Sequence, residues 1–283
     1  MKSLFKYAAM AVLATVSCSL ASCSDDDNDD PKRPDAPVID QVFPEGVPSQ
    51  IGDTKIVRNS NGQVTKIETK DESYTSTAEF EYGTFSRATE FQVKLTQYDS
   101  YDPTDKTVIY MQLNDKGFVK YALEVYSDPE YSDDEWWFEY NADGQLNYLK
   151  RTEGDNEVTR ITYTNGDITS RATTSDDHQT PSIYNISYTD NNVKRPIANK
   201  GGIMLFDDLF QIDMDEMEVA YYAGLLGKAT KNLPVRQQYA GSDNDGEYTS
   251  FEWTLNANGL PTLLNIKEVN PWGGYDEQIS FVW

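Results

Sequence analysis

The sequence predicts an all-β protein, an antiparallel up-and-down meander or barrel-like sheet of roughly 10–14 strands with one short helix. Two observations carry this prediction. Apolar and polar residues alternate with a period of two, as in 91–95, 251–255 and 279–283. Such alternation is typical of half-buried antiparallel strands. The motif Asn-x-x-Gly also recurs between these segments, where it predicts hairpin turns.

The alternation assigns side chains to faces. Phe91, Val93 and Leu95 are expected on the core face, as are Ile279, Phe281 and Trp283. In the segment 119–125 the pattern divides the residues into a core set and a solvent set, namely Val119, Tyr121, Leu123 and Val125 against Lys120, Ala122 and Glu124.

The turns are predicted from the pairs Asn59 and Gly62, Asn114 and Gly117, Asn141 and Gly144, and Asn256 and Gly259, together with the shorter Asn165-Gly166. Asn can bond its own backbone, and Gly accepts a positive φ, so each pair suits a hairpin tip. The single helix is expected within 213–226, where Met214, Met217, Tyr221 and Leu225 recur at helical spacing. We expect it to pack over an edge or mouth of the sheet, with Gly227 after its end.

Residues 1–22 are predicted to be a lipoprotein signal peptide. Lys2 and Lys6 precede a short apolar run, and Leu20, Ala21, Ser22 and Cys23 resemble the bacterial lipobox at all of its positions. Cys23 is therefore the expected lipid attachment site, which anchors the chain to a membrane through acyl chains. The alternative is an ordinary signal peptide with an incidental cysteine.

Residues 23–37 are expected to form an acidic, disordered tether, and residues 38–283 a single antiparallel β domain. The tether has no large apolar residue and cannot pack. Its acidic run resembles the surface-export signal of Bacteroidota lipoproteins, which implies an outer-membrane location facing the cell exterior. The whole chain is acidic, with 47 Asp and Glu against 24 Lys and Arg. Because such a surface repels phosphate backbones, nucleic acid is not an expected partner.

The lipobox, the acidic tether, the Asn-x-x-Gly meander and the segment Tyr221–Lys228 together resemble a family of uncharacterised Bacteroidota surface lipoproteins. That family is described as a domain of unknown function with a porin-like fold. The resemblance covers the chain from about Asp40 to Trp283. It implies a curled sheet that closes toward a barrel, and it implies no activity.

The residues available for catalysis are few. His178 is the single histidine and sits in a polar loop sequence, and processing leaves no free thiol. A zinc site built on several His or Cys is excluded, and no glycine-rich phosphate loop is present, so nucleotide binding is not expected. A calcium loop at Gly241–Gly246 with Glu252 lacks its first ligand. We therefore expect no catalytic residue, no metal and no cofactor.

Aromatic residues give the positive indication of binding. Trp136 and Trp137 are adjacent, so in a strand one of them must point away from the core, and Asp133, Asp134 and Glu135 precede them. Aromatic rings stack on sugar rings while carboxylates accept hydroxyl hydrogen bonds. Trp136, Trp137 and Trp272 are therefore candidate ligand-stacking residues, although Trp also fills barrel interiors.

The sequence thus favours a non-catalytic, surface-anchored lipoprotein that binds a glycan or a surface protein partner. Three alternatives remain open: a glycan hydrolase that uses paired carboxylates, a structural subunit of a surface complex, and a small outer-membrane barrel. The last is suggested by the terminal Trp283, with Phe281 and Ile279 alternating before it. An interior filled by side chains would favour a scaffold, and an open one a binding site.

Overall fold

The computed structural model describes residues 39–71, 73–87, 89–126, 132–152, 156–241, 246–270 and 273–283. Several sequence predictions lie outside these residues: the signal peptide with its lipobox Leu20, Ala21 and Ser22, the lipid attachment site Cys23, the acidic tether and Trp272. The structure therefore bears on the β domain.

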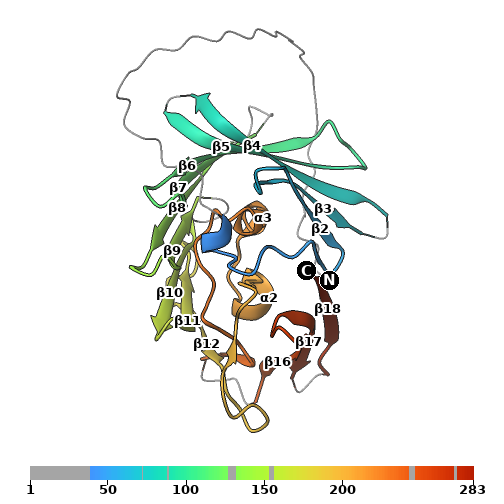
Figure 1. Ribbon diagram of the computed structural model, residues 1–283. Helices are drawn as coiled ribbons and strands as arrows, with labels where there is room; N and C mark the ends of the chain where they lie inside the picture. The colour runs from blue at the N-terminus through green and yellow to red at the C-terminus, as the bar shows by residue number, and fades with distance from the viewer. Residues whose placement is uncertain are drawn as a thin grey trace.

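Sixteen antiparallel strands form a closed barrel, which confirms the predicted fold class (Figure 1). In chain order the strands of the barrel are β1 (Gln50–Ile51), β2 (Thr54–Arg58), β3 (Val64–Lys70), β4 (Thr75–Ser86), β5 (Glu90–Asp99), β6 (Lys106–Leu113), β7 (Val119–Val125), β8 (Asp134–Tyr140), β9 (Leu146–Arg151), β10 (Val158–Thr164), β11 (Asp167–Thr174), β12 (Ser182–Ser187), β15 (Arg236–Tyr239), β16 (Tyr248–Leu255), β17 (Pro261–Val269) and β18 (Asp276–Val282). The number exceeds the expected range because strands as short as β1 and β15 are too brief to show alternation.

Each barrel strand pairs with its neighbour in the chain, except where β12 pairs with β15. The barrel closes where β1 pairs with both β2 and β18, so that Ile51 lies opposite Phe281. This closing strand is short, and it pairs with each neighbour over two residues. The interruption between β12 and β15 is an insertion, residues 188–235, which we call the plug.

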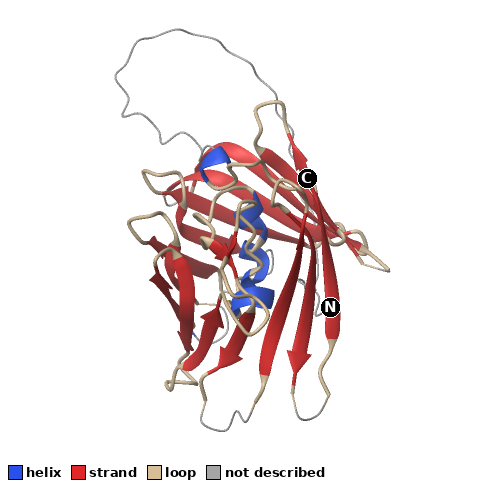
Figure 2. Cartoon of the chain, turned by 60° about the horizontal axis from the view of Figure 1, so that its bottom comes forward, coloured by secondary structure: helices blue, strands red, loops and turns tan. Residues whose placement is uncertain are grey.

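The plug lies inside the ring of strands (Figures 1 and 2). It contains a two-stranded sheet and three short helical elements, which are β13 (Ile197–Ala198), β14 (Asn232–Leu233), α2 (Phe206–Phe210), the 3-10 helix η2 (Asp215–Met217) and α3 (Val219–Tyr222). A further 3-10 helix, η1 (Ile39–Gln41), precedes β1. The expected helix over 213–226 is thus broken into η2 and α3, and it fills the interior instead of covering an edge or mouth.

The core is continuous between the plug and the inner face of the barrel. Met214, Met217, Tyr221 and Leu225 are all buried, as their helical spacing predicted. The hydroxyls of Tyr221 and Tyr222 donate to backbone carbonyls of the plug at 2.6 and 2.9 Å, which satisfies two buried polar groups. In the described part of the chain the barrel therefore has a packed interior, the outcome that the sequence argument linked to a scaffold.

The four Asn-x-x-Gly motifs form hairpin tips, as predicted. In each tip the Asn side-chain oxygen accepts a backbone N–H four residues on, at 3.0–3.1 Å, and the Gly has a φ of 80–84°. The backbone of the plug donates hydrogen bonds to two hairpin tips. Lys228 N donates to Gly144 O at 2.8 Å, and Lys231 N donates to Gly166 O at 2.9 Å. The recurring turns thus also hold the plug.

The predicted faces of β7 are correct for Val119 and Lys120 and wrong for the residues that follow. Ala122 and Glu124 point inward and are buried, whereas Tyr121, Leu123 and Val125 are only partly buried. The cause is a register shift between Gln112 and Leu113, where the pairing passes from Tyr121 to Val119. A bulge adds one residue to one strand, so every side chain beyond it changes face.

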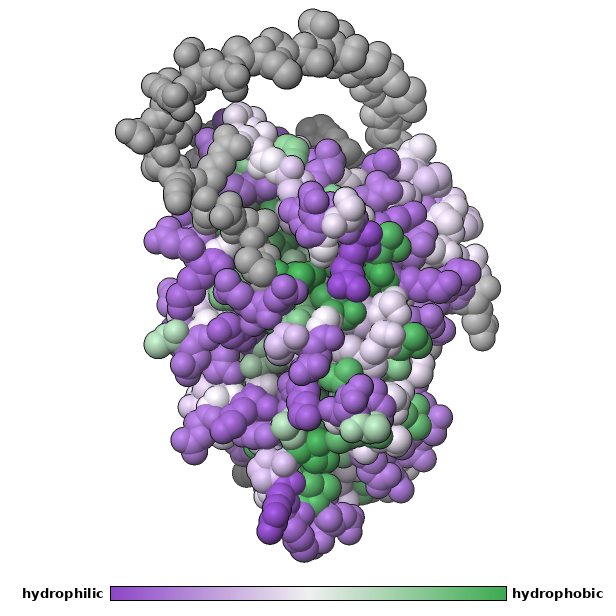
Figure 3. All heavy atoms as spheres, viewed as in Figure 1, coloured by the Kyte–Doolittle hydropathy of each residue, from purple (hydrophilic) through white to green (hydrophobic). Residues whose placement is uncertain are grey.

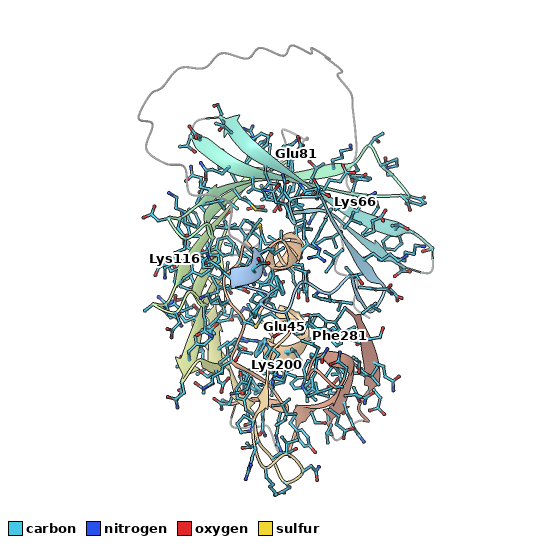
Figure 4. All side chains as sticks on the ribbon, in the orientation of Figure 1. Glu45, Lys66, Glu81, Lys116, Lys200 and Phe281 are labelled. Atoms are coloured by element: carbon cyan, nitrogen blue, oxygen red, sulfur yellow. The ribbon has the colours of Figure 1, made fainter. Side chains whose placement is uncertain are left out.

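The outer face of the barrel is polar. Figure 3 shows hydrophilic residues along the periphery of one view, and two ion pairs, Lys94–Glu81 and Lys66–Glu68, span outward positions at 2.7 and 2.9 Å. Figure 4 places Lys116 at the periphery, with Glu45 and Lys200 within the ring of strands in that view. Among the described residues, no helix is long and apolar enough to cross a membrane.

Candidate functional site

The β4–β5 hairpin creates a groove on the outside of the barrel. A register shift between Tyr82 and Phe85 changes the direction of the side chains near the hairpin tip. Phe91 is buried, but it packs against Tyr110 and Tyr121, outward residues of β6 and β7, at ring distances of 5.7 and 6.2 Å. Val93 and Leu95 point into the core as predicted, whereas Phe91 belongs to this outer cluster.

The space beside this cluster is a groove of about 480 Å³, within the size range of small-molecule sites. Its lining is mainly apolar and aromatic, and it comes from the hairpin tip and from β6, β7 and β8. The lining residues are Thr89, Phe91, Gln112, Lys120, Tyr121, Leu123 and Trp137.

Trp137 is the largest side chain of the groove. Its ring lies between two cross-strand neighbours, Tyr121 on β7 at 5.8 Å between ring centroids and Lys150 on β9, whose Nζ is 4.8 Å from the ring centroid. Rows of side chains that contact one another across neighbouring strands stabilise a sheet. An aromatic–cation pair adds about 0.5–1 kcal/mol at an exposed site. The row holds Trp137 in place at the wall of the groove.

Several polar groups near the groove already have partners. Tyr121 Oη donates to Glu135 Oε1 at 2.6 Å, and burial, reinforced by this carboxylate, raises the pKa of Tyr121. Gln112 Nε2 donates to Thr89 Oγ1 at 2.8 Å. The ammonium group of Lys120 makes no hydrogen bond or ion pair with any described residue, and its side chain is exposed.

The acids that precede Trp136 have structural roles. Asp134 accepts hydrogen bonds from Tyr126 Oη at 2.9 Å and Thr152 Oγ1 at 3.0 Å, which join β7, β8 and the chain after β9. Glu135 accepts the Tyr121 hydroxyl described above. None of these carboxylates is among the groove's lining residues.

The two adjacent tryptophans separate as the alternation requires. Trp136 is fully buried and stacks on Phe138 at 6.3 Å, so it cannot serve as a platform for an external ligand. The candidate role of Trp136 is therefore corrected to a core role. Trp137 faces outward and lines the groove, and Trp272 lies outside the described residues.

A charged cluster joins the barrel wall to the plug on the inner side. Arg151, on β9, donates to Asp213 Oδ2 at 2.8 Å and to Asp215 Oδ2 at 2.9 Å, and its Nε lies 3.7 Å from Glu157. Burial alone would lower the pKa of Arg151, but the three carboxylates raise it. The guanidinium also lies over Trp136, at 5.6 Å. Because its charges are paired in this way, we assign the cluster a structural role, the attachment of the plug to the barrel wall.

The other sequence candidates do not form a site in the described residues. The backbone of His178 bonds Ser175 in an exposed turn. Asp243 and Asp245 of the calcium-like loop lie outside the described residues. Within the described part of the chain, no three His, Cys, Asp or Glu side chains are grouped so as to hold one metal ion.

Most groove residues could not be found from the sequence. Thr89, Phe91, Gln112, Lys120 and Leu123 come from two different hairpins and share no local motif. Tyr121 gave a weak signal in the sequence, because it shares an apolar face of β7 with Leu123 and Val125. This face lies beyond the bulge in β7. Only the pairing of the strands brings these side chains together.

Comparison with known proteins defines the family. A solved porin-like protein from Bacteroides uniformis ATCC 8492 has a TM-score of 0.59 and 18% identity, covering 81% of this chain and 89% of that one. A porin-like protein from Bacteroides vulgatus ATCC 8482 has a TM-score of 0.44 and 13% identity, covering 77% and 97%. These likenesses concern the fold, and no curated protein matches. Residues 53–263 match a domain of unknown function (DUF4595) with porin-like fold, and the chain belongs to this family.

Proposed function

We propose that this chain is a lipid-anchored protein of the outer membrane that binds a glycan at the cell surface, without catalysis, in the groove beside Trp137. The observation that carries the proposal is the groove itself, which combines the outward rings of Trp137 and Tyr121 with polar side chains at its margin. Aromatic faces pack against the apolar faces of sugar rings, and the polar groups can bond their hydroxyls.

The anchoring part of the proposal rests on the sequence. The lipobox that ends at Cys23, followed by the acidic run, supports acylation and surface export. The porin-like fold is compatible with outer-membrane association. A barrel embedded in lipid needs an apolar outer band, so the outward ion pairs Lys94–Glu81 and Lys66–Glu68 argue against the small outer-membrane barrel.

The absence of catalysis is also part of the proposal. Glycoside hydrolysis uses two carboxyl groups across the scissile bond. The lining of the groove contains no Asp or Glu, and the nearby Glu135 already accepts the Tyr121 hydroxyl. This favours binding over the hydrolase alternative.

The test uses the mature, acylated protein purified in detergent and applied to a glycan array. We expect at least one glycan to bind, and Trp137→Ala to weaken that binding about tenfold or more, as for a central aromatic contact. The matched control is Tyr98→Ala. Like Trp137, Tyr98 is an aromatic residue of the outer face with a lysine over its ring, here Lys106 at 4.9 Å, but it lies outside the groove.

A bound glycan whose affinity does not change in Trp137→Ala would place the binding elsewhere. A uniformly negative array would remove glycan binding and favour a structural subunit, which the packed interior also suits. Release of reducing ends from a polysaccharide would contradict the non-catalytic part.

A further inference from the structure

Three cations lie in or beside the groove, although the chain has a formal net charge of −23. Lys120 lines the groove, and Lys150 lies over the Trp137 ring. Arg87 lies over Tyr110, at 4.9 Å from its ring centroid, on the same aromatic cluster. Among the described residues none of these three cations forms a salt bridge.

Two other lysines of the outer face are paired with carboxylates, in Lys94–Glu81 and Lys66–Glu68. Lys106 lies over the Tyr98 ring, as Lys150 lies over Trp137, but outside the groove. Beside the groove, the carboxylate of Glu135 accepts the Tyr121 hydroxyl. The lining of the groove contains no Asp or Glu, so its one charged side chain, Lys120, is a cation in a chain that is acidic overall.

We propose that the groove takes an anionic saccharide, a glycan whose carboxylate is held by Lys120 and Lys150 while its ring packs against Trp137 and Leu123. The proposal deepens, and rests on, glycan binding in the groove. The Lys120 side chain is exposed, and the one contact that the described residues show for the Lys150 ammonium is with the Trp137 ring, so both can turn toward a carboxylate. Lysine is a compact point charge with three donors on a flexible stem, which suits a ligand of variable position.

The apolar lining distinguishes a saccharide from a purely charged ligand. A carboxylate on a flexible peptide would use the two lysines and leave Trp137 and Leu123 without contact. A sugar acid presents both a charge and an apolar ring face, which matches the charge and the aromatic wall together. Because the lysines are exposed, each contact contributes little, and added salt should weaken it.

The experiment compares oligogalacturonate with the same oligosaccharide after its carboxyl groups are reduced to alcohols. Binding to the mature acylated protein in detergent is measured by calorimetry at low and high salt. We expect the acidic form to bind at least about tenfold more tightly, and Lys120→Gln and Lys150→Gln each to weaken it about two- to fivefold. Lys120→Arg keeps the charge and should bind as the parent does.

The control is Lys55→Gln, which removes an equal charge from an exposed position on β2, outside the groove. Equal binding of both oligosaccharides, lost in Trp137→Ala and unchanged in Lys120→Gln, would overturn the anionic preference and leave glycan binding intact. Binding of neither oligosaccharide, together with a negative array, would remove both proposals. Polyglutamate that competes as well as oligogalacturonate would show a charge surface and no sugar site.

Discussion

The guanidinium of Arg151, in the barrel wall, donates to the carboxylate of Asp213, in the plug, at 2.8 Å. The two residues come from β9 and from the chain between α2 and η2. Backbone hydrogen bonds fasten the plug to the hairpin tips at Gly144 and Gly166, whereas this contact fastens it to the barrel wall through side chains. The same guanidinium lies over the ring of Trp136, so Arg151 both forms the ion pairs and packs against a core residue.

Replacement of Arg151 should therefore loosen the plug. Arg151→Met removes the partner of Asp213 and Asp215, which then repel one another, and we expect a loss of about 2–3 kcal/mol in the free energy of unfolding. Urea denaturation measures this loss, and hydrogen exchange should show faster opening of residues 212–222. Lys66→Met removes the exposed Lys66–Glu68 pair and should cost under about 1 kcal/mol. Equal effects of the two changes would contradict the fastening role.

Glu218 should make stability fall as the pH rises. Burial, with Asp208 nearby, raises the pKa of Glu218 from 4.5 to about 8, while its Oε1 accepts the N–H of Phe206 at 3.0 Å. The folded chain then binds a proton that the unfolded chain releases, so unfolding becomes easier between pH 4.5 and 8. Glu218→Gln keeps the acceptor without the charge. We expect it to stabilise the fold by roughly 1–3 kcal/mol at pH 8 and to change little at pH 4.5.

Thermal unfolding across this pH range tests the prediction, and Glu252→Gln, which changes an exposed residue of β16, is the control. Asp208 and Glu216 contribute in the same direction, because burial raises their pKa values to about 6 and about 7. A Glu218→Gln protein whose stability follows the parent at every pH would show that the carboxyl is not protonated in the fold.

Gly227 is required where the plug meets the tip of the β8–β9 hairpin. Its φ is +83°, and a Cβ there would lie 2.6 Å from Gly144 O and 2.8 Å from the Tyr140 ring. Gly227→Ala should cost about 2 kcal/mol or more, from both strain and the clash. Gly46→Ala separates the two causes, because Gly46 has a φ of +92° with nothing within 4 Å of the added atom. If the two variants lost equal stability, backbone strain would account for the whole effect and the clash would contribute nothing.

Cys23→Ser tests the proposed anchor. Without the thiol the chain cannot receive a diacylglyceryl group, so we expect labelled palmitate to be absent from the protein and processing before residue 23 to stop. The measurement is mass spectrometry of the amino terminus, together with metabolic labelling. Cys18→Ser is the control and should leave acylation unchanged. Labelled lipid that persists in Cys23→Ser would disprove the predicted attachment site.

Local patterns in the sequence determined the class of fold. The alternation in 91–95 and 279–283 and the repeated Asn-x-x-Gly tips are short-range signals, since the side chains of a strand alternate and a tight turn needs a residue with positive φ. The same reasoning separated Trp136 from Trp137, because neighbours in a strand must face opposite sides. These features depend on nearby residues, so they can be read from the chain.

Only the tertiary structure decided how the strands close and what fills them. The bulge at Lys120 reversed the faces of β7, and the pairing of β12 with β15 placed the plug inside the barrel. The groove joins Phe91, Tyr121 and Trp137 from three hairpins. Register and closure are set by packing between residues far apart in the chain, and no local pattern records them.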